Sequence, residues 1–334
     1  MAMLFAVMGF ISTIANGYFC NAVVKVFVFA LFYVKVTRIR FRSQDVIGGT
    51  KLYVLMSCAI SGLIVLSFIF GYPHMESTYY MGRYSIGITG LYKNPNYLSS
   101  FINIAYFIVL YVLMYKNNNL KLKVIYVCML LLFLYSFYLS GTRASLLVAG
   151  FTTSVLLLTY TFKSNNKLRA YCAVIFIIAI ILYSLESLSL MFDDFLGNRK
   201  IGEDEGRILS WNYAFNVLID SPFLGLGLNG WNIAVNGTSY MEYLHNIFLE
   251  MLLDYGFLGF TIFLIMFFSG LRGIKRQDCL FVTLFFFVAT FPLLFQNGLT
   301  EVNLWRCLLM NRIVVNYSRY SQTGITGLLK SSYA

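Results

Sequence analysis

The chain has 334 residues, of which 59% are hydrophobic and 12% are charged, and its mean hydropathy is +0.73. Soluble domains are roughly 45–50% apolar and about 25% charged, so this composition excludes a soluble globular domain and indicates an integral membrane protein. A formal net charge of +11 would favour nucleic acid as the partner of a soluble protein. Here the basic residues lie in short loops between apolar runs, and we expect no nucleic-acid binding.

The chain begins with an apolar stretch that has neither a basic start nor a small-residue cleavage site, so we expect a retained membrane helix rather than a signal peptide. A helix needs about 20 mostly apolar residues to cross a membrane. Apolar runs cover residues 3–34 (one long helix or two short ones), 52–70, 97–115, 124–139, 144–162, 170–185, 246–270, 279–295 and 302–316. They predict an all-α polytopic membrane protein, a single domain over residues 1–334 with about eight to ten transmembrane helices.

Basic residues cluster in every second loop, and the positive-inside rule places these loops in the cytoplasm. The four clusters are Lys35, Arg38, Arg40, Arg42 and Lys51; Lys116, Lys121 and Lys123; Lys163, Lys167 and Arg169; and Arg272, Lys275 and Arg276. The alternate loops are then extracytoplasmic. The longest of them, residues 186–243, is rich in acidic residues and also contains tryptophan and glycine, which favours an ordered element on the membrane surface.

Within that loop we expect a short helix near residues 206–219. Its apolar positions recur at spacings of three and four residues, and a proline follows them: Ile208, Trp211, Phe215, Leu218, Ile219, then Pro222. Such a helix would lie at the outer face of the membrane with its tryptophan at headgroup depth. The sequence "GLGLNG", residues 225–230, matches a dinucleotide-binding pattern, but it does not link a strand to a helix in a βαβ unit, so we reject that function.

Two arginines begin predicted helices on the extracytoplasmic face. Arg143, in "LSGTRASLLVAG", follows Thr142, which can cap the next helix, and Arg207 begins the interfacial helix. Because a helix N-terminus is already positive, an arginine there favours an anion, and backbone N–H groups with a guanidinium fit a phosphate or diphosphate. The alternative for each also stays open: Arg143 can pair with an outer-loop carboxylate or reach lipid headgroups, and the acidic residues 203–205 can neutralise Arg207.

The sequence "LHNIFLEMLLDYGFLGF", residues 244–260, places one of the two histidines at the mouth of an apolar run. By helical spacing His245 shares a face with Gly256 and Gly259, which would let another helix approach closely. The adjacent stripe carries the polar residues Asn246, Glu250 and Asp254. Ionisable residues within a span often face a wet functional cavity. His245 is therefore either a general base or a hydrogen-bonded interfacial group, and Asp254 requires a buried partner.

Four motifs in order carry a family resemblance: "GLYKNPNYLSS", "LSGTRASLLVAG", "GRILSWNYAFNVLIDSPFLGLGLNGW" and "HNIFLEMLLDYGFLGF". With them the chain resembles the O-antigen polymerase and O-antigen ligase superfamily, the Wzy/WaaL-like membrane glycosyltransferases. The resemblance implies a GT-C-like helical bundle in the bacterial cytoplasmic (inner) membrane, with an extracytoplasmic active site that takes glycan from undecaprenyl diphosphate. It implies that Arg143 and Arg207 bind the diphosphate, that His245 activates the acceptor hydroxyl, and that no metal or other cofactor is needed.

We therefore expect a polymerase of polysaccharide repeat units (O-antigen in lipopolysaccharide, capsule or exopolysaccharide) that acts by inverting transfer. The expected catalytic bases are His245 and Glu242. Residues expected to bind the glycan or to support the site are Arg83, Asn94, Asn96, Trp211, Asn246 and Glu250. Of these, Asn246 and Glu250 are expected to orient His245. Expected partners are the undecaprenyl diphosphate-linked oligosaccharide, membrane lipid, a chain-length regulator and a flippase.

Two alternatives accompany this prediction. His245 is followed directly by Asn246, whereas some ligases space the histidine from its amide partner by one residue, so an O-antigen ligase or a protein O-oligosaccharyltransferase stays open. A polysaccharide or lipid transporter is less favoured, because transporters place polar groups near the middle of the bilayer and often have two related halves. Here the polar groups gather at the outer face, and no internal repeat is visible.

Overall fold

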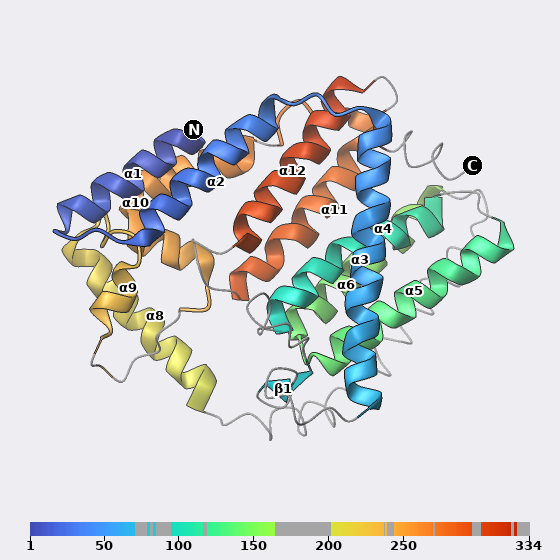
Figure 1. Ribbon diagram of the computed structural model, residues 1–334, viewed down its shortest axis with the longest axis horizontal. Helices are drawn as coiled ribbons and strands as arrows, with labels where there is room; N and C mark the ends of the chain where they lie inside the picture. Colours follow the sequence, from blue (N-terminus) through green and yellow to red (C-terminus); the bar gives the residue numbers. More distant parts are fainter. Residues whose placement is uncertain are drawn as a thin grey trace. The chain divides into compact units, whose positions relative to one another are not determined.

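The computed structural model describes residues 1–70, 79–80, 83–84, 95–115, 119–163, 202–236, 238, 244–269, 271–295, 302–321 and 324–325. For residues 79–80, 83–84, 143, 163, 202–208, 295 and 302–303 it describes the backbone alone. The elements, shown in Figure 1, are α1 (Ala2–Ala15), α2 (Asn21–Arg38), α3 (Ser43–Ile69), β1 (Tyr79–Tyr80), β2 (Arg83–Tyr84), α4 (Pro95–Tyr115), α5 (Leu120–Leu139), α6 (Arg143–Lys163), α8 (Gly202–Asp220), α9 (Gly230–Ala234), α10 (Ile247–Ser269), η1 (Arg276–Asp278), α11 (Cys279–Thr290), η2 (Phe291–Phe295) and α12 (Val302–Tyr320).

Within the described ranges, six helices are long and apolar enough to cross a membrane: α3, α4, α5, residues 144–162 of α6, α10, and the segment 276–294 that contains α11. They confirm the predicted all-α polytopic membrane fold. The predicted run 170–185 lies outside the described residues. A pair of two-residue antiparallel strands, β1 and β2, is the only β structure among the described residues.

The first apolar run, 3–34, forms two helices. Asn16 ends α1 and Gly17 follows with a φ of +79°. The amide of Gly17 donates to Ile14 O (2.9 Å) and that of Tyr18 to Thr13 O (3.4 Å), the paired bonds of a glycine-terminated helix end. With 14 residues, α1 is roughly 21 Å long, less than the ~30 Å hydrocarbon thickness, and it packs along α2.

The chain divides into two compact units. Unit 1 comprises Met1–Arg38, Asn166–Gly270 and Leu293–Leu309, and unit 2 comprises Ile39–Asn165, Leu271–Pro292 and Met310–Ala334. Helix α12 contributes to both. The single domain predicted over residues 1–334 stays a prediction, and each unit is described by itself below.

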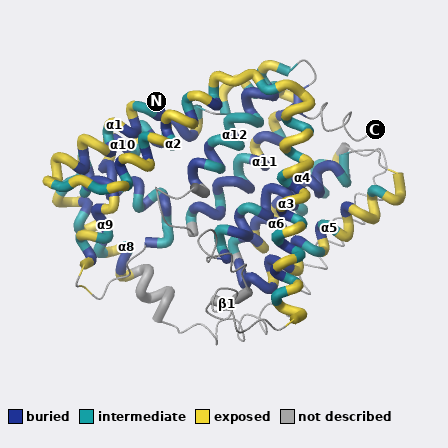
Figure 2. Tube along the Cα trace, viewed as in Figure 1, coloured by how far each residue is buried: buried dark blue, intermediate teal, exposed yellow. Residues whose placement is uncertain are grey.

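Unit 2 is built around α4, which packs against α3, α5, α6 and α11. In α4, 78% of the membrane-length window is buried, against 22% in α3 and 33% in α5. Figure 2 shows this contrast between the buried central helix and its exposed neighbours. Exposed apolar side chains on α3 and α5 suit a lipid environment, because lipid tails solvate them as well as protein does.

In unit 2, the helix ends next to the basic loops, which are predicted to be cytoplasmic, lie near one another. Ser43 Oγ at the start of α3 lies 2.7 Å from Tyr317 Oη near the end of α12. The Tyr115 ring at the end of α4 lies 5.9 Å from the ring of Tyr160 near the end of α6. The Phe281 ring, near the start of α11, lies 4.8 Å from that of Tyr111. This shared end, called the basic end below, agrees with the alternation of basic loops in the sequence.

Candidate functional site

At the opposite end of unit 2, a buried polar network joins the beginnings of α4 and α6. Ser99 Oγ lies 2.9 Å from Ser140 Oγ, and Asn103 Nδ2 donates to Ser145 Oγ at 3.0 Å. Thr142, the predicted cap, places its hydroxyl 3.2 Å from Ser140 Oγ, while its carbonyl accepts from the amide of Ser145. These five side chains are at most 2% exposed. The network therefore holds the two helix beginnings side by side.

This arrangement brings two predicted site residues to the same end of unit 2. Helix α6 begins at Arg143, as the motif predicted, and Asn96 lies in the first turn of α4, just after Pro95. Proline suits that first position, because the N–H that it lacks would have no partner in the helix. Arg83 lies in β2, where it pairs with Tyr80. Asn94 lies outside the described residues.

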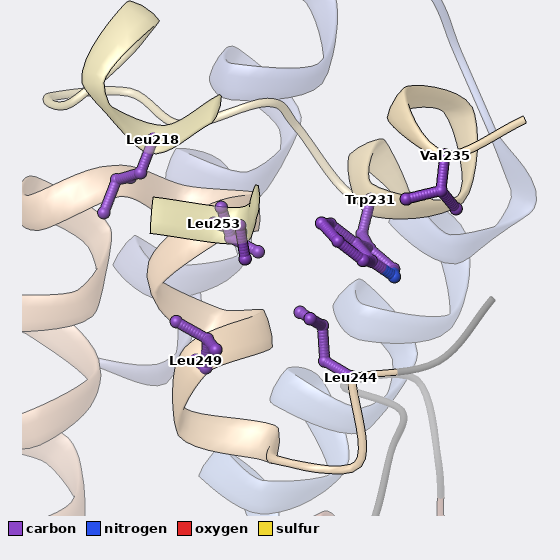
Figure 3. Close-up of a cluster of buried hydrophobic side chains, with 7 residues drawn as sticks. Leu218, Trp231, Val235, Leu244, Leu249 and Leu253 are labelled. Atoms are coloured by element: carbon purple, nitrogen blue, oxygen red, sulfur yellow. The ribbon is translucent and has the colours of Figure 1, made fainter. Parts of the chain in front are cut away.

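Unit 1 brings a second group together around His245. Trp211 Nε1 on α8 donates to the carbonyl of Leu244 at 2.8 Å, so the indole is bonded to the residue before the histidine. Below that contact, a hydrophobic cluster joins α8, α9 and α10; its buried members are Ala214, Leu218, Trp231, Val235, Leu244, Leu249 and Leu253. Figure 3 shows Leu244 and Trp231 pointing toward each other in this cluster. Trp211 thus supports the histidine segment from within the protein.

Helix α8 contains the predicted 206–219 segment and begins at Gly202, four residues earlier than predicted. Ala214 and Leu218 of its apolar stripe are buried, whereas Phe215 is 51% and Ile219 73% exposed. Ala214 and Leu218 pack on the cluster, whereas Phe215 and Ile219 are left uncovered. This pattern suits a helix that lies on a membrane surface. Arg207 lies one turn before Trp211 on this helix.

The histidine itself lies in a turn. His245 has a φ of +53°, a left-handed conformation that is uncommon for residues other than glycine, although asparagine, aspartate and histidine adopt it more often than the rest. Asn246 Oδ1 accepts from the amides of Phe248 (3.1 Å) and Leu249 (3.2 Å) and caps α10. Glu250 lies in the first turn of that helix. Glu242, the second predicted base, lies outside the described residues.

Helix α10 is interrupted at Gly256, whose φ of 62° and ψ of −172° are not helical. A membrane helix that breaks leaves backbone groups without partners, each at a cost of several kcal/mol. The loop after α8 provides the partners, through four backbone bonds: Leu226 N to Leu253 O (2.7 Å), Gly227 N to Asp254 O (3.0 Å), Phe257 N to Pro222 O (2.8 Å) and Leu258 N to Phe223 O (3.3 Å). We call residues 221–230 the docking loop.

Glycine is required on both sides of this contact. A Cβ on Gly225 would lie 2.3 Å from Leu253 O, and one on Gly256 would lie 2.4 Å from the Phe223 backbone. Both residues also have positive φ. The first glycine of "GLGLNG" thus gains a structural reason, since Gly225 lets the docking loop enter the helix break.

The prediction that Gly256 and Gly259 admit another helix is corrected by this geometry. At Gly256 the docking loop approaches, not a helix. A Cβ on Gly259 would lie 2.5 Å from the Cβ of Tyr255, a residue of the same helix. Periodicity indicated the close approach but not the break, because a helix wheel assumes an unbroken helix.

The buried partner that Asp254 requires is also in this loop. Asp254 is 2% exposed, and its Oδ2 accepts from the amide of Asn229 at 3.4 Å. The polar edge of α1 closes the same contact: Ser12 Oγ lies 2.9 Å from Asp254 O, and Asn16 Nδ2 donates to Gly225 O at 3.0 Å. The polar residues within the apolar N-terminal run, Ser12 and Asn16, are the sequence signal that could have indicated this contact.

Tyr18 completes the contact from the turn after α1. Its hydroxyl oxygen lies 2.8 Å from the carbonyl oxygen of Leu226 and 2.9 Å from that of Leu228, so its single proton is shared between these two acceptors. Burial raises the pKa of the Tyr18 phenol, and the nearby Asp254 charge and Cys20 raise it further. The phenol therefore stays protonated at neutral pH and keeps its donor.

The structure thus assembles two groups of predicted site residues, one in each unit. Asn96 and Arg143 lie at one end of unit 2, whereas Arg207, Trp211 and His245, together with the cap of α10, lie in unit 1. Among the described residues, no group of three or more histidine, cysteine, aspartate or glutamate side chains is placed to hold a metal ion.

Comparison with protein-family models finds a match to the O-antigen ligase family (Wzy_C) over residues 127–264, somewhat less than half of the chain. A search of curated proteins finds no match. The matched segment begins within α5 and ends just beyond the break in α10, so it contains Arg143, Arg207 and His245. With six helices able to span a membrane among the residues that the structure describes, the chain is a multi-pass membrane protein, and its resemblance to the O-antigen polymerase and ligase superfamily is confirmed over residues 127–264.

Proposed function

We propose that this protein polymerises polysaccharide repeat units by inverting transfer at the outer face of the bacterial cytoplasmic membrane. The family match supports a membrane glycosyltransferase that uses a lipid-linked oligosaccharide. The observation that carries the proposal is the Trp211–Leu244 hydrogen bond, because it fixes the helix of Arg207 beside the turn of His245 in one compact unit. Arg207, the proposed donor-binding cation, and His245, the candidate base, therefore lie on segments that this hydrogen bond joins.

In the proposed step, the hydroxyl oxygen of an acceptor sugar attacks C1 of the donor sugar while the bond from C1 to the phosphate oxygen breaks. Undecaprenyl diphosphate leaves with the electron pair, and His245 accepts the hydroxyl proton. Arg143 and Arg207 bind the diphosphate and stabilise the negative charge that grows on it. A GT-C-like bundle and a second base at Glu242 belong to the same proposal.

The supporting residues have narrower proposed roles. Asn246 caps α10 and so fixes the turn that contains His245. Arg83, Asn94 and Asn96, which lie in or beside the loop before α4, are proposed to contact the glycan. Glu250 and the Trp211 indole are proposed to support the histidine segment. A flippase that supplies the donor and a chain-length regulator are proposed partners.

The test is a reconstitution of the purified protein with a labelled undecaprenyl diphosphate repeat unit, comparing wild type with Arg143→Ala, Arg207→Ala and His245→Ala. Removing a general base lowers rates by roughly 10²–10⁴-fold, and removing one electrostatic stabiliser by roughly 10²–10³-fold. Lys121→Ala, an exposed cation at the basic end, is the matched control and should keep wild-type activity. Equal polymerisation by all five proteins would contradict the residue assignment.

The product distinguishes polymerase from ligase. Ladders of repeat units on the carrier lipid identify polymerisation. Glycan that appears on lipid A-core or on protein hydroxyls, without ladders, identifies an O-antigen ligase or a protein O-oligosaccharyltransferase and would replace the polymerase proposal.

A further inference from the structure

A pocket of about 490 Å³ lies at the basic end of unit 2, at the other end of that unit from Arg143. The connection before α3 and the end of α12 form its walls. Its lining residues are Ile39, Arg40, Phe41, Arg42, Ser43, Asn316, Tyr317, Tyr320 and Ser321. Two of them are arginines and none is acidic, so the lining carries a net positive charge.

The arginines are held where an anion could reach them. The guanidinium carbon of Arg40 lies 5.5 Å from the centroid of the Tyr320 ring, a cation–π contact that orients the side chain while leaving its edge available for hydrogen bonds. The carboxylate of Asp45, in the first turn of α3, accepts from the backbone amide of Arg42 at 3.1 Å. Lys275 adds a cation at the rim, where its ammonium contacts the carbonyl of Ser321.

The floor of the pocket supplies neutral donors. Ser43 is the first residue of α3, a 27-residue helix, so the pocket opens on the positive end of a helix dipole. The Ser43 and Tyr317 hydroxyls lie 2.7 Å apart and fix each other's position. A guanidinium fork, hydroxyl groups and a helix beginning together match the oxygens of a phosphate.

The surface beside the pocket indicates where that phosphate comes from. The third and fourth turns of α3 present apolar side chains to the outside: Leu52 is 59%, Leu55 60% and Met56 50% exposed. A phospholipid whose headgroup entered the pocket could therefore lay its acyl chains along α3. Basic clusters at the cytoplasmic face attract anionic lipids in general.

We propose that this pocket binds the phosphate of an anionic phospholipid in the cytoplasmic leaflet. The proposal does not depend on the glycosyltransferase activity, because the pocket shares no residue with the proposed donor site. A soluble phosphate offers the same chemistry, and the test separates the two sources.

The test is native mass spectrometry of the full chain released from nanodiscs that contain phosphatidylglycerol or phosphatidylcholine. We expect wild type to retain phosphatidylglycerol in preference to phosphatidylcholine. The Arg40→Gln/Arg42→Gln variant should lose at least ~10-fold in affinity, because hydrogen bonds to charged groups are lost. Lys121→Gln, which removes a charge at the same end outside the pocket, should bind as wild type does. Equal retention by wild type and the double variant would overturn the proposal.

Inorganic phosphate is the second arm of the test. If millimolar phosphate leaves bound phosphatidylglycerol in place, the lipid source is supported; if it displaces the lipid fully and binds without it, the lipid assignment is overturned in favour of a soluble anion. Size-exclusion chromatography and thermal unfolding check that the variants fold. Should the double variant aggregate, the exposed single variant Arg42→Gln carries the same comparison, with a smaller loss expected.

Discussion

At the scale of single residues, Trp211 gains a more defined role than the sequence suggested. The sequence placed it at headgroup depth or against glycan, but its Nε1 donates to the carbonyl that precedes His245. A residue that acts through such a bond is a positioning residue. Its effect on activity should therefore differ from that of a residue that contacts the donor.

We expect Trp211→Phe to keep the apolar packing of α8 and to lose only this hydrogen bond. A hydrogen bond contributes about 0.5–1.5 kcal/mol, so kcat should fall by roughly 3- to 10-fold while the KM for the lipid donor stays unchanged. Tyr213→Phe, two positions along the same helix, keeps the ring that lies 6.0 Å from the Trp231 ring and should leave kcat unchanged. An unchanged kcat in Trp211→Phe would rule out the positioning role.

At the scale of elements, the break in α10 and the docking loop depend on each other. Four backbone hydrogen bonds cross between them, and glycine is needed on both sides. The loop leads from α8, the helix of Trp211, to α9 and its cluster residue Trp231. The break is therefore the point at which the segment predicted to be extracytoplasmic is attached to the membrane helix that follows the histidine turn.

We expect Gly256→Ala to detach the docking loop, because its Cβ would lie 2.4 Å from the Phe223 backbone at a φ that alanine rarely adopts. Hydrogen–deuterium exchange should then speed up at the amides of Leu226 and Gly227, which donate across the break. Gly150→Ala in α6, where the added Cβ meets nothing within 4 Å, is the control and should leave these amides protected. Protection that persists in Gly256→Ala would contradict the proposed attachment.

The same element shows what the sequence could and could not predict. The apolar run 246–270 predicted α10 within one residue at each end, because length and hydrophobicity alone define a membrane helix. Length and hydrophobicity could not predict the break at Gly256. The break depends on hydrogen bonds from the docking loop, about 30 residues earlier in the chain. The sequence predicted that Asp254 needs a buried partner. It could not predict that this partner is the amide of Asn229, because that contact forms only in the tertiary structure.

At the scale of the whole molecule, the charge pattern and the helices lead to one topology. The basic loops predicted the cytoplasmic face, and within unit 2 the helix ends beside those loops meet at one end. Arg143 lies at the other end, where a buried network of hydroxyl and amide groups joins the beginnings of α4 and α6. The family match supports O-antigen polymerase or ligase activity in general, and the predicted orientation would place Arg143 on the extracytoplasmic side.

We expect this orientation to be measurable by cysteine labelling in a variant that lacks the six native cysteines. Lys121→Cys should react with a membrane-impermeant maleimide only after the cytoplasm is opened, whereas Thr238→Cys, in the extracytoplasmic loop, should react in intact spheroplasts. Both positions are exposed, so access depends on the side of the membrane and not on burial. The reverse pattern would place the candidate site in the cytoplasm and contradict the topology.

Transfer from the lipid diphosphate is tested most directly by the yield of free undecaprenyl diphosphate from wild-type protein in proteoliposomes, counted against new glycosidic bonds. A transferase that uses the lipid diphosphate as leaving group must release one carrier molecule for each linkage, and we expect that ratio throughout the reaction. Glycan that crosses the bilayer still joined to its carrier, with no carrier released and no bond formed, would identify a transporter and contradict the account.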